Sequence, residues 1–279
     1  MKKIMIDPGH AGYYYNKSPV NESYFESRVM WELAAYLSSA LVNRGFVVDM
    51  TRYSINDDPE LSDRGRRAKG YDLFISLHSN AASNAKADAP WLIHYSSDDR
   101  TGLDEESKKI ARILGPVVSE TMGVSAPYYY TKACDFDRDG DGRIGDEYYG
   151  VLFGAKSVGV PGLIIEHSFH TNAKAAEWLL SDKNLMALAE AEADALAKYY
   201  GMEEPMTTAE KKDFEALEKR VNEHLKEYDW TLACPEWAQS TVHKLHQKGV
   251  LKGDEKGQLN LTLDALRILV ILDRQGLFD

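Results

Sequence analysis

The sequence has few cysteines, no long apolar run and no block of basic residues. Its two cysteines, Cys134 and Cys234, form neither a CxxC pair nor a disulfide framework. No stretch approaches the length of a transmembrane helix. The N-terminal MKKIMIDPGH is too poor in apolar residues for a secretory signal. We therefore expect a chain that is made in the cytoplasm, stays out of the membrane and is released by another factor.

Positive charge is also scarce. The chain carries 33 Lys and Arg residues against 44 Asp and Glu residues, a formal net charge of −11 at pH 7. Binding to a phosphate backbone depends on basic side chains that displace counterions. The composition therefore argues against nucleic acid as a partner. Hydrophobic residues make up 44% of the 279 residues, which is enough for an ordinary globular core.

Strand-like and helix-like segments alternate through the first 200 residues. Apolar runs predict strands at 3–7, 46–52, 71–78, 91–97 and 161–169, and periodic patterns predict helices at 26–44, 62–70, 104–122 and 172–200. Unbroken apolar strands that are separated by helices are typical of sheets covered on both faces. We predict an α/β fold with a mostly parallel twisted sheet and helices on both faces, plus a small helical C-terminal domain.

The segment from Gly201 to Pro205 is the best domain boundary. We predict a catalytic domain at 1–201, a linker at 202–212 and a helical domain at 213–279. Apolar residues from Phe214 to Tyr228 recur at helical spacing. This stripe could pack on the rest of the C-terminal domain or pair two chains as a homodimer.

Polar residues follow several of the predicted strands. We expect His10 at the end of the first strand, His78 at the end of the third and Glu166 at the end of the last central strand. Open α/β sheets bind ligands beyond the carboxyl ends of their strands, so these side chains are expected to lie together. Glu26 shares the core-facing side of the first helix with Met30. Two histidines and one glutamate, with a fourth position left to water, form a known catalytic zinc set. Glu22 is the alternative to Glu26 as the carboxylate ligand.

Four segments carry a family resemblance that covers roughly residues 2 to 200. IDPGHAG, then Glu26, then SLHSNA, then LIIEHSFHTN resemble, in order and spacing, the zinc-dependent N-acetylmuramoyl-L-alanine amidases of type 3. The resemblance implies that His10, Glu26 and His78 bind zinc and that Glu166 is the catalytic carboxylate. It also implies the substrate, the amide between the lactyl group of N-acetylmuramic acid and L-alanine in peptidoglycan. The sequence departs from many relatives at Met30 and at two histidines, His167 and His170.

The predicted activity is hydrolysis by zinc-activated water, with Glu166 moving the proton. Such an enzyme would serve as a phage endolysin or a bacterial autolysin at the bacterial cell wall. The alternatives are a zinc peptidase that cuts within the stem peptide and a catalytically inactive wall-binding protein. The roles of His167 and His170 stay open. The remaining histidines are expected to be structural or surface residues: His94, His224, His243 and His246.

A second metal site is predicted in an acidic loop. Asp137, Asp139 and Asp141 have the spacing of the first half of an EF-hand-type calcium loop. Gly142 and Ile144 also fit that pattern, but the closing acidic position holds Tyr148. Other carboxylates are alternatives for closing the loop or shifting its register: Asp135, Asp146 and Glu147.

The C-terminal segment resembles one S-layer-homology repeat. The matching residues are Trp237-Ala238, Leu245, Gly249-Val250-Leu251 and Gly253, although the usual Thr-Arg-Ala-Glu stretch is missing. A generic small helical domain is the alternative interpretation. Either form is suited to recognise the wall, so peptidoglycan and a secondary wall polymer are the expected partners.

Overall fold

The computed structural model describes residues 1–96, 102–202, 235–252, 261 and 263–278. Contacts divide the chain into two compact units, Met1–Pro205 and Met206–Asp279. The predicted stripe from Phe214 to Tyr228 and nearly all of the predicted linker lie outside the described residues. The two units are therefore described one at a time.

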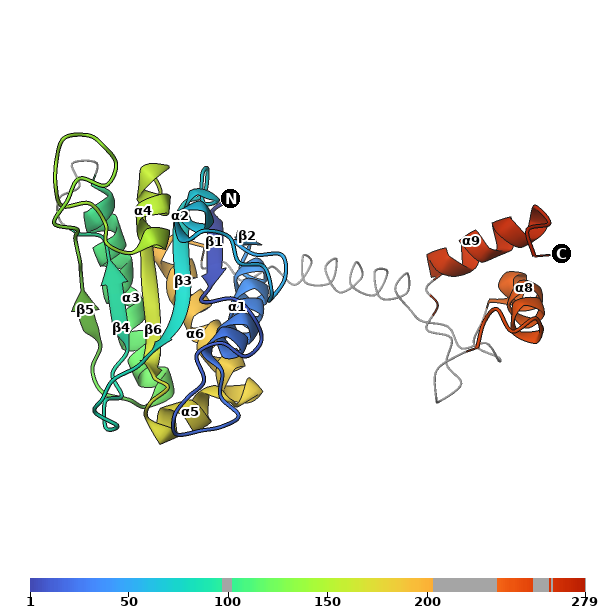
Figure 1. Ribbon diagram of the computed structural model, residues 1–279, viewed down its shortest axis with the longest axis horizontal. Helices are drawn as coiled ribbons and strands as arrows, with labels where there is room; N and C mark the ends of the chain where they lie inside the picture. Colours follow the sequence, from blue (N-terminus) through green and yellow to red (C-terminus); the bar gives the residue numbers. More distant parts are fainter. Residues whose placement is uncertain (97–101, 203–234, 253–260, 262, 279) are drawn as a thin grey trace. The chain divides into compact units, whose positions relative to one another are not determined.

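The first unit is built on one six-stranded sheet (Figure 1). Its strands in sheet order are β2 (Val47–Met50), β1 (Lys3–Pro8), β3 (Leu73–Asn80), β6 (Gly162–Phe169), β4 (Trp91–His94) and β5 (Tyr128–Tyr130). Neighbouring strands are parallel except β4 and β6, which run antiparallel. The predicted mostly parallel sheet is confirmed.

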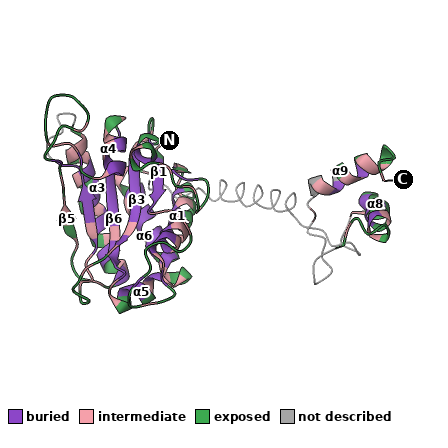
Figure 2. Ribbon diagram, viewed as in Figure 1, coloured by how far each residue is buried: buried purple, intermediate pink, exposed green. Residues whose placement is uncertain are grey.

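Helices cover both faces of this sheet, as predicted. One face packs against α1 (Glu26–Val42), α3 (Leu103–Met122) and α6 (Asp182–Tyr199). The other face packs against α4 (Gly150–Ser157), and α2 (Leu61–Arg66) packs on α4. Successive strand residues point to opposite faces, so Ile4 and Ile6 join the first core and Met5 the second. Figure 2 shows the strands largely buried between these helices.

The first helix illustrates how the sequence pattern becomes packing. In α1, Met30, Leu33 and Leu37 are fully buried, because residues three and four apart share one helical face. The helix ends at Val42, two residues before the predicted end. Gly45 then takes a φ of +84°, a left-handed conformation that glycine adopts without strain.

Two elements of the first unit, β5 and α4, were not predicted. The sequence of α4 does not read as a helix because its glycines have low helix propensity. In the fold, these glycines permit close packing of α4 against α2. A Cβ atom at Gly154 would lie 2.1 Å from the Ser62 carbonyl oxygen on α2. The alanine-rich stretch also forms two helices, α5 (Ala173–Leu179) and α6. Ser181 separates them because its side chain caps α6 by accepting a hydrogen bond from the Asn184 amide.

The described part of the second unit contains α8 (Glu236–Gln247) and α9 (Leu263–Arg274). Ala238 and Val242 on α8 pack with Leu266 and Val270 on α9. Asp273 adds polar contacts, because its carboxylate accepts hydrogen bonds from Thr241 Oγ1 at 2.7 Å and Lys244 Nζ at 2.8 Å. In the ranges that the structure describes, none of the helices is both long and apolar enough to cross a membrane.

Candidate active site

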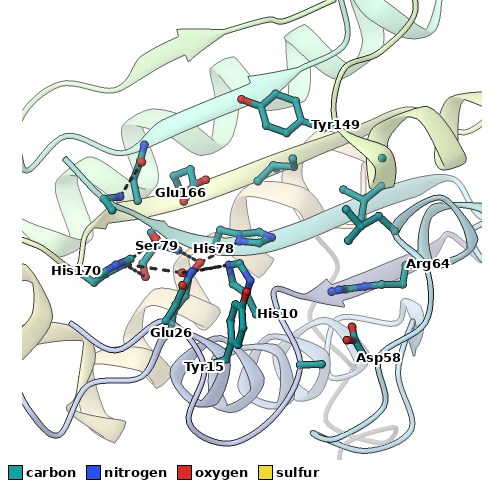
Figure 3. A pocket seen from close by; sticks show the side chains of 18 residues that line it. His10, Tyr15, Glu26, Asp58, Arg64, His78, Ser79, Tyr149, Glu166 and His170 are labelled. Carbon is teal, nitrogen blue, oxygen red and sulfur yellow. Dashed lines mark hydrogen bonds and ion pairs between the residues drawn. The ribbon is translucent and has the colours of Figure 1, made fainter. Parts of the chain in front are cut away.

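The structure brings His10, Glu26 and His78 together at the carboxyl end of the sheet. One possible ligand atom of each lies within 4.8 Å of the others. Glu26 Oε2 is 3.2 Å from His10 Nε2, and Glu26 Oε1 is 2.9 Å from His78 Nδ1. The carboxylate therefore contacts both imidazole rings, whose centroids are 4.9 Å apart (Figure 3).

Local backbone geometry makes this approach possible. His10 follows β1 with a φ of +56°, a conformation that turns the chain sharply at the strand end. Gly9 donates its amide hydrogen to the Leu77 carbonyl oxygen at 2.9 Å. A Cβ atom at Gly9 would lie 2.5 Å from His78 Cε1, so a larger residue would displace the histidine. Glycine at this position therefore lets two histidines from different strands meet.

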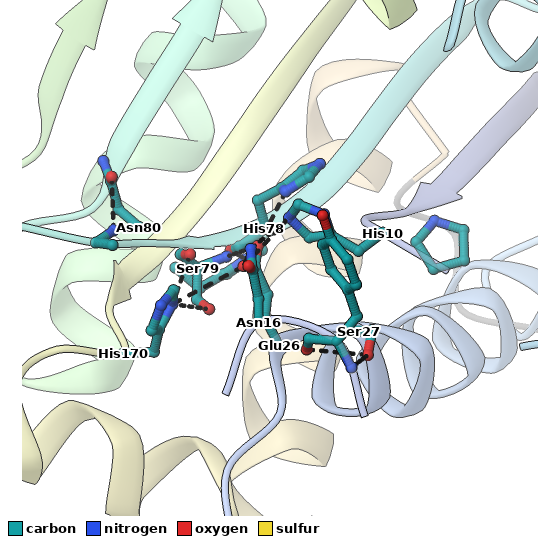
Figure 4. A network of polar contacts seen from close by, with 12 residues as sticks. His10, Asn16, Glu26, Ser27, His78, Ser79, Asn80 and His170 are labelled. Carbon is teal, nitrogen blue, oxygen red and sulfur yellow. Dashed lines mark hydrogen bonds and ion pairs between the residues drawn. The ribbon is translucent and has the colours of Figure 1, made fainter. Parts of the chain in front are cut away.

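Glu26 is the buried centre of a polar network (Figure 4). Asn16 Nδ2 donates to Glu26 Oε2 at 2.8 Å, and the Ser79 amide donates to Oε1 at 3.0 Å. Burial by itself would raise the pKa of Glu26, but hydrogen bonds with His10 and His78 outweigh it and hold that pKa well below its ordinary value. An ionised, buried carboxylate that contacts two imidazoles is suited to bind a cation.

The alternative carboxylate, Glu22, lies outside this network. Its side chain is exposed, and it does not line the cavity into which the histidines open. Glu26 is the first residue of α1, so the helix directs it toward the strand ends. The structure thus places Glu26 with the histidines and leaves Glu22 in solvent.

Glu166 faces the same cavity from β6. Its Cα is the register partner of His78 on the parallel strand β3. Its Oε2 atom is buried and has no hydrogen-bond partner among the described residues. Burial, and next the negative charge of Glu26, raise the pKa of Glu166 well above its ordinary value. A carboxyl group in this state can hold a proton and pass it on near neutral pH.

The cavity that joins these groups has a volume of about 570 Å³. Sequence reasoning missed several residues that line it, among them Tyr15, Asn16, Arg64 and Tyr149. Burial, together with the nearby Tyr130 and Glu166, raises the pKa of Tyr149 to about 12. Figure 3 shows Tyr149, which directly precedes α4, and Arg64 on α2 beyond Glu166 and the histidines.

The two histidines near Glu166 have different surroundings. His170 lines the cavity, and its Nδ1 lies 2.9 Å from the Ser79 carbonyl oxygen. His167 is fully buried instead. Its Nε2 lies 3.0 Å from Glu192 Oε1, and its Nδ1 lies 3.1 Å from the His78 carbonyl oxygen. Both histidines therefore contact the β3 backbone at or directly after His78.

The acidic loop gathers Asp137, Asp139 and Asp146, whose carboxylates each place an oxygen within 4.8 Å of the others. Asp141, a predicted calcium ligand, does not belong to this group. Backbone amides of the same loop already donate to these carboxylates, as Gly140 does to Asp137 Oδ1 at 2.7 Å. Glu147, one of the alternatives, points elsewhere, because its buried Oε1 binds Ser96 and Lys156. Calcium binding here stays a prediction.

Comparisons with known proteins agree on one family and one fold. The family model described as N-acetylmuramoyl-L-alanine amidase matches residues 4–198. The catalytic domain of CwlV, an N-acetylmuramoyl-L-alanine amidase from Bacillus (Paenibacillus) polymyxa var. colistinus, superposes with a TM-score of 0.58 at 18% identity. The match covers 73% of this chain and 100% of that one.

Two further solved structures give similar values. The N-acetylmuramoyl-L-alanine amidase AmiC2 of Nostoc punctiforme has a TM-score of 0.57 at 18% identity, covering 72% of this chain and 97% of its own. An N-acetylmuramoyl-L-alanine amidase from Clostridium difficile 630 has a TM-score of 0.58 at 20% identity, covering 72% and 98%. At these identities the superpositions show the fold. No curated protein matches the chain closely enough to count as a relative.

Proposed function

This chain belongs to the N-acetylmuramoyl-L-alanine amidase family, and from that membership we propose that it hydrolyses the amide between N-acetylmuramic acid and L-alanine in peptidoglycan with the help of zinc. The observation that carries the proposal is the meeting of His10, Glu26, His78 and Glu166 at one cavity. These are the residues that the sequence resemblance implied, and four separate elements supply them.

The donor set fits zinc. Two imidazole nitrogens and one carboxylate oxygen, open to a cavity on one side, are typical of catalytic zinc centres. Glu26 is 2% exposed, and a buried carboxylate gains stability from a cation beside it. We propose His10, Glu26 and His78 as the ligands. Bound zinc would polarise the scissile carbonyl and make water more acidic.

The protein's own groups supply the remaining steps. Glu166 takes the proton from the attacking water and returns it to the departing alanine amine, a task that suits a carboxyl group of raised pKa. Asn16 and the Ser79 amide hold Glu26 in position through its two oxygens. Ser79 itself is fixed by Tyr24, whose hydroxyl donates to Ser79 Oγ at 2.7 Å.

Digestion of purified peptidoglycan, followed by mass spectrometry, tests the reaction. The expected products are intact glycan strands and stem peptides with free L-alanine amino termini. Cleavage within the stem peptide would instead show a zinc peptidase. No product from the zinc-loaded protein, while the protein still sediments with the wall, would show an inactive wall-binding protein. The Glu166→Gln variant is the matched control for contaminating hydrolases.

We also propose that residues 1–201 form the catalytic domain, that residues 202–212 form a linker and that residues 213–279 form a domain that binds the cell wall. All four proposed site residues lie in the first segment. A chain ending at 201 should therefore hydrolyse soluble muropeptides at the full-length rate but clear intact walls more slowly. Equal clearing by both forms would remove the targeting role of 213–279.

The proposed cellular role follows from the substrate. An enzyme of this kind acts at the bacterial cell wall, as an endolysin or an autolysin, with peptidoglycan as its main partner. A secondary wall polymer as ligand of 213–279, the S-layer-homology resemblance and a homodimer through this segment stay predictions.

A further inference from the structure

Three consecutive tyrosines are exposed beside the proposed active site. Tyr13, Tyr14 and Tyr15 lie in the loop between β1 and α1 and are 42%, 73% and 55% exposed. Folding normally buries part of such large side chains, and a cluster of exposed aromatic rings often marks a binding surface. We call these three residues the tyrosine loop.

The rings of the tyrosine loop are ordered by contacts with one another and with the site. Tyr13 and Tyr14 pack edge to face at 4.7 Å, and Tyr14 packs on Phe25 at 5.2 Å. Tyr15 lies 5.2 Å from the ring of His10, a proposed zinc ligand, and lines the cavity. Tyr15 therefore lies at the proposed reaction centre, and the Tyr13–Tyr14 pair precedes it in the same loop, outside the lining of the cavity.

The backbone of the loop is tied to α1 and to a neighbouring segment. The Tyr15 amide donates to Ser27 Oγ at 3.1 Å, and the Glu26 amide donates to the Asn16 carbonyl oxygen at 3.0 Å. The Gly12 amide donates to the Ile55 carbonyl oxygen at 2.7 Å. These bonds fix the loop before any ligand arrives, so little conformational entropy is lost when the rings are covered.

These contacts also indicate what the loop can bind. Both backbone polar groups of Tyr15 are already used, because its amide donates to Ser27 Oγ and its carbonyl oxygen accepts from Ser27 Oγ at 3.2 Å. The loop is therefore poorly placed to pair with a peptide backbone at Tyr15, as an added strand would require. The loop presents aromatic faces and phenol hydroxyls to a ligand. Arg28 lies over the Tyr13 ring as a neighbouring cation. Uncharged rings that combine C–H faces with polar rims, as N-acetylated sugars do, match this surface better than an extended peptide.

We propose that the tyrosine loop binds sugar rings of the glycan strand and so places the muramic acid arm of the substrate on the β1–α1 side of the cavity. This assignment rests on the proposed amidase function, because that substrate joins a sugar and a peptide at the scissile amide. Tyr15 binds the sugar nearest the proposed zinc ligands, and Tyr13 and Tyr14 bind the next sugars of the glycan strand.

A binding experiment tests the loop without catalysis. The probe is a peptide-free tetrasaccharide of alternating N-acetylglucosamine and N-acetylmuramic acid, titrated by calorimetry into the full-length chain. Tyr14→Ala should weaken binding about three- to tenfold, the size expected for losing one aromatic contact. Tyr14→Trp should retain it. Tyr53→Ala removes a tyrosine that is 89% exposed and does not line the cavity, and it should bind as the unchanged protein does.

Kinetics with two substrates give the second test. Tyr13→Ala and Tyr14→Ala should raise KM for a tetrasaccharide-linked stem peptide with little change in kcat. KM for a muramoyl dipeptide, which has one sugar, should change less. Equal changes for both substrates, or unchanged tetrasaccharide binding in Tyr14→Ala and Tyr13→Ala, would overturn the proposal.

The two experiments separate this inference from the proposed function. If no muropeptide is cleaved but the tetrasaccharide binds and Tyr14→Ala weakens it, the tyrosine loop stands and the amidase assignment fails. If cleavage proceeds and both variants behave like the unchanged chain, the amidase assignment stands and the loop proposal fails.

Discussion

The chain gathers metal-binding types of side chain at two places that are built very differently. His10, Glu26 and His78 come from the end of β1, the start of α1 and the strand β3, and their carboxylate is buried. Asp137, Asp139 and Asp146 come from one loop, and two of the three are exposed. In the first group the fold holds the donors together, whereas in the second the local sequence does.

The difference shows why a cluster of possible ligands does not by itself indicate a bound metal ion. The loop's own amides already donate to the exposed carboxylates, as in the bond from the Gly142 amide to Asp137 Oδ2 at 2.9 Å, and exposure leaves these carboxylates open to solvent. A buried carboxylate has no such access to water, so its desolvation must be offset by donors or a cation. The buried group therefore supports a metal more strongly than the exposed one.

Metal removal should separate the two groups most strongly. A chelator should abolish hydrolysis, and zinc should restore it, because the proposed chemistry requires zinc. His78→Ala should lose both bound zinc and activity, whereas Asp139→Ala in the exposed loop should keep both. Metal analysis of the purified variants provides the measurement. Glu26→Ala that keeps stoichiometric zinc, with Glu22→Ala losing it, would show that the ligand choice is wrong.

Glu166→Gln should have the next largest effect. The amide nearly preserves the shape of the side chain but cannot accept the proton, so the rate should fall by about 10²–10⁴-fold. Zinc content should stay close to that of the unchanged protein, since Glu166 is not a proposed ligand. Activity within about tenfold of the original, or loss of zinc, would exclude the proton-transfer role.

Asn16→Gly should moderately lower the zinc affinity of the buried cluster formed by His10, Glu26 and His78. Asn16 has a φ of +52°, which glycine tolerates, so the change removes mainly the side-chain amide that contacts Glu26 and His10. Groups that orient a metal ligand are typically worth about 10–100-fold in metal affinity or activity. Competition with a zinc-binding dye would measure the affinity. Asn84→Gly, in an exposed loop, is the control, and equal affinities of the two variants would argue against a positioning role.

Calcium should give the smallest effect. If the acidic loop binds it, calcium at about ten times Kd would stabilise the folded chain by about 1.4 kcal/mol. That corresponds to a rise in melting temperature of about 3–6 °C. Combined Asp137→Asn and Asp139→Asn should remove the rise, whereas Asp141→Asn, outside the group, should keep it. An unchanged melting temperature at millimolar calcium would leave the loop as a solvated acidic turn.

Some elements were predictable because their signals are local. The buried spacing of Met30, Leu33 and Leu37 on α1 reflects a period of 3.6 residues. The apolar strands at 71–78 and 161–169 correspond to β3 and β6. Such patterns fail where glycine or a short run weakens them, as in α4 and β5, which tertiary packing stabilises instead.

The sequence by itself determined the α/β class and named His10, Glu26, His78 and Glu166, because polar residues after apolar strands stand out and the motifs fit a family. Only the tertiary structure placed Asn16 against Glu26, aligned Glu166 with His78 and set Tyr15 beside His10. The physical reason is that periodicity reports which face of one element is buried. Contacts between side chains on different elements depend on strand register, loop conformation and close packing, which no single segment encodes.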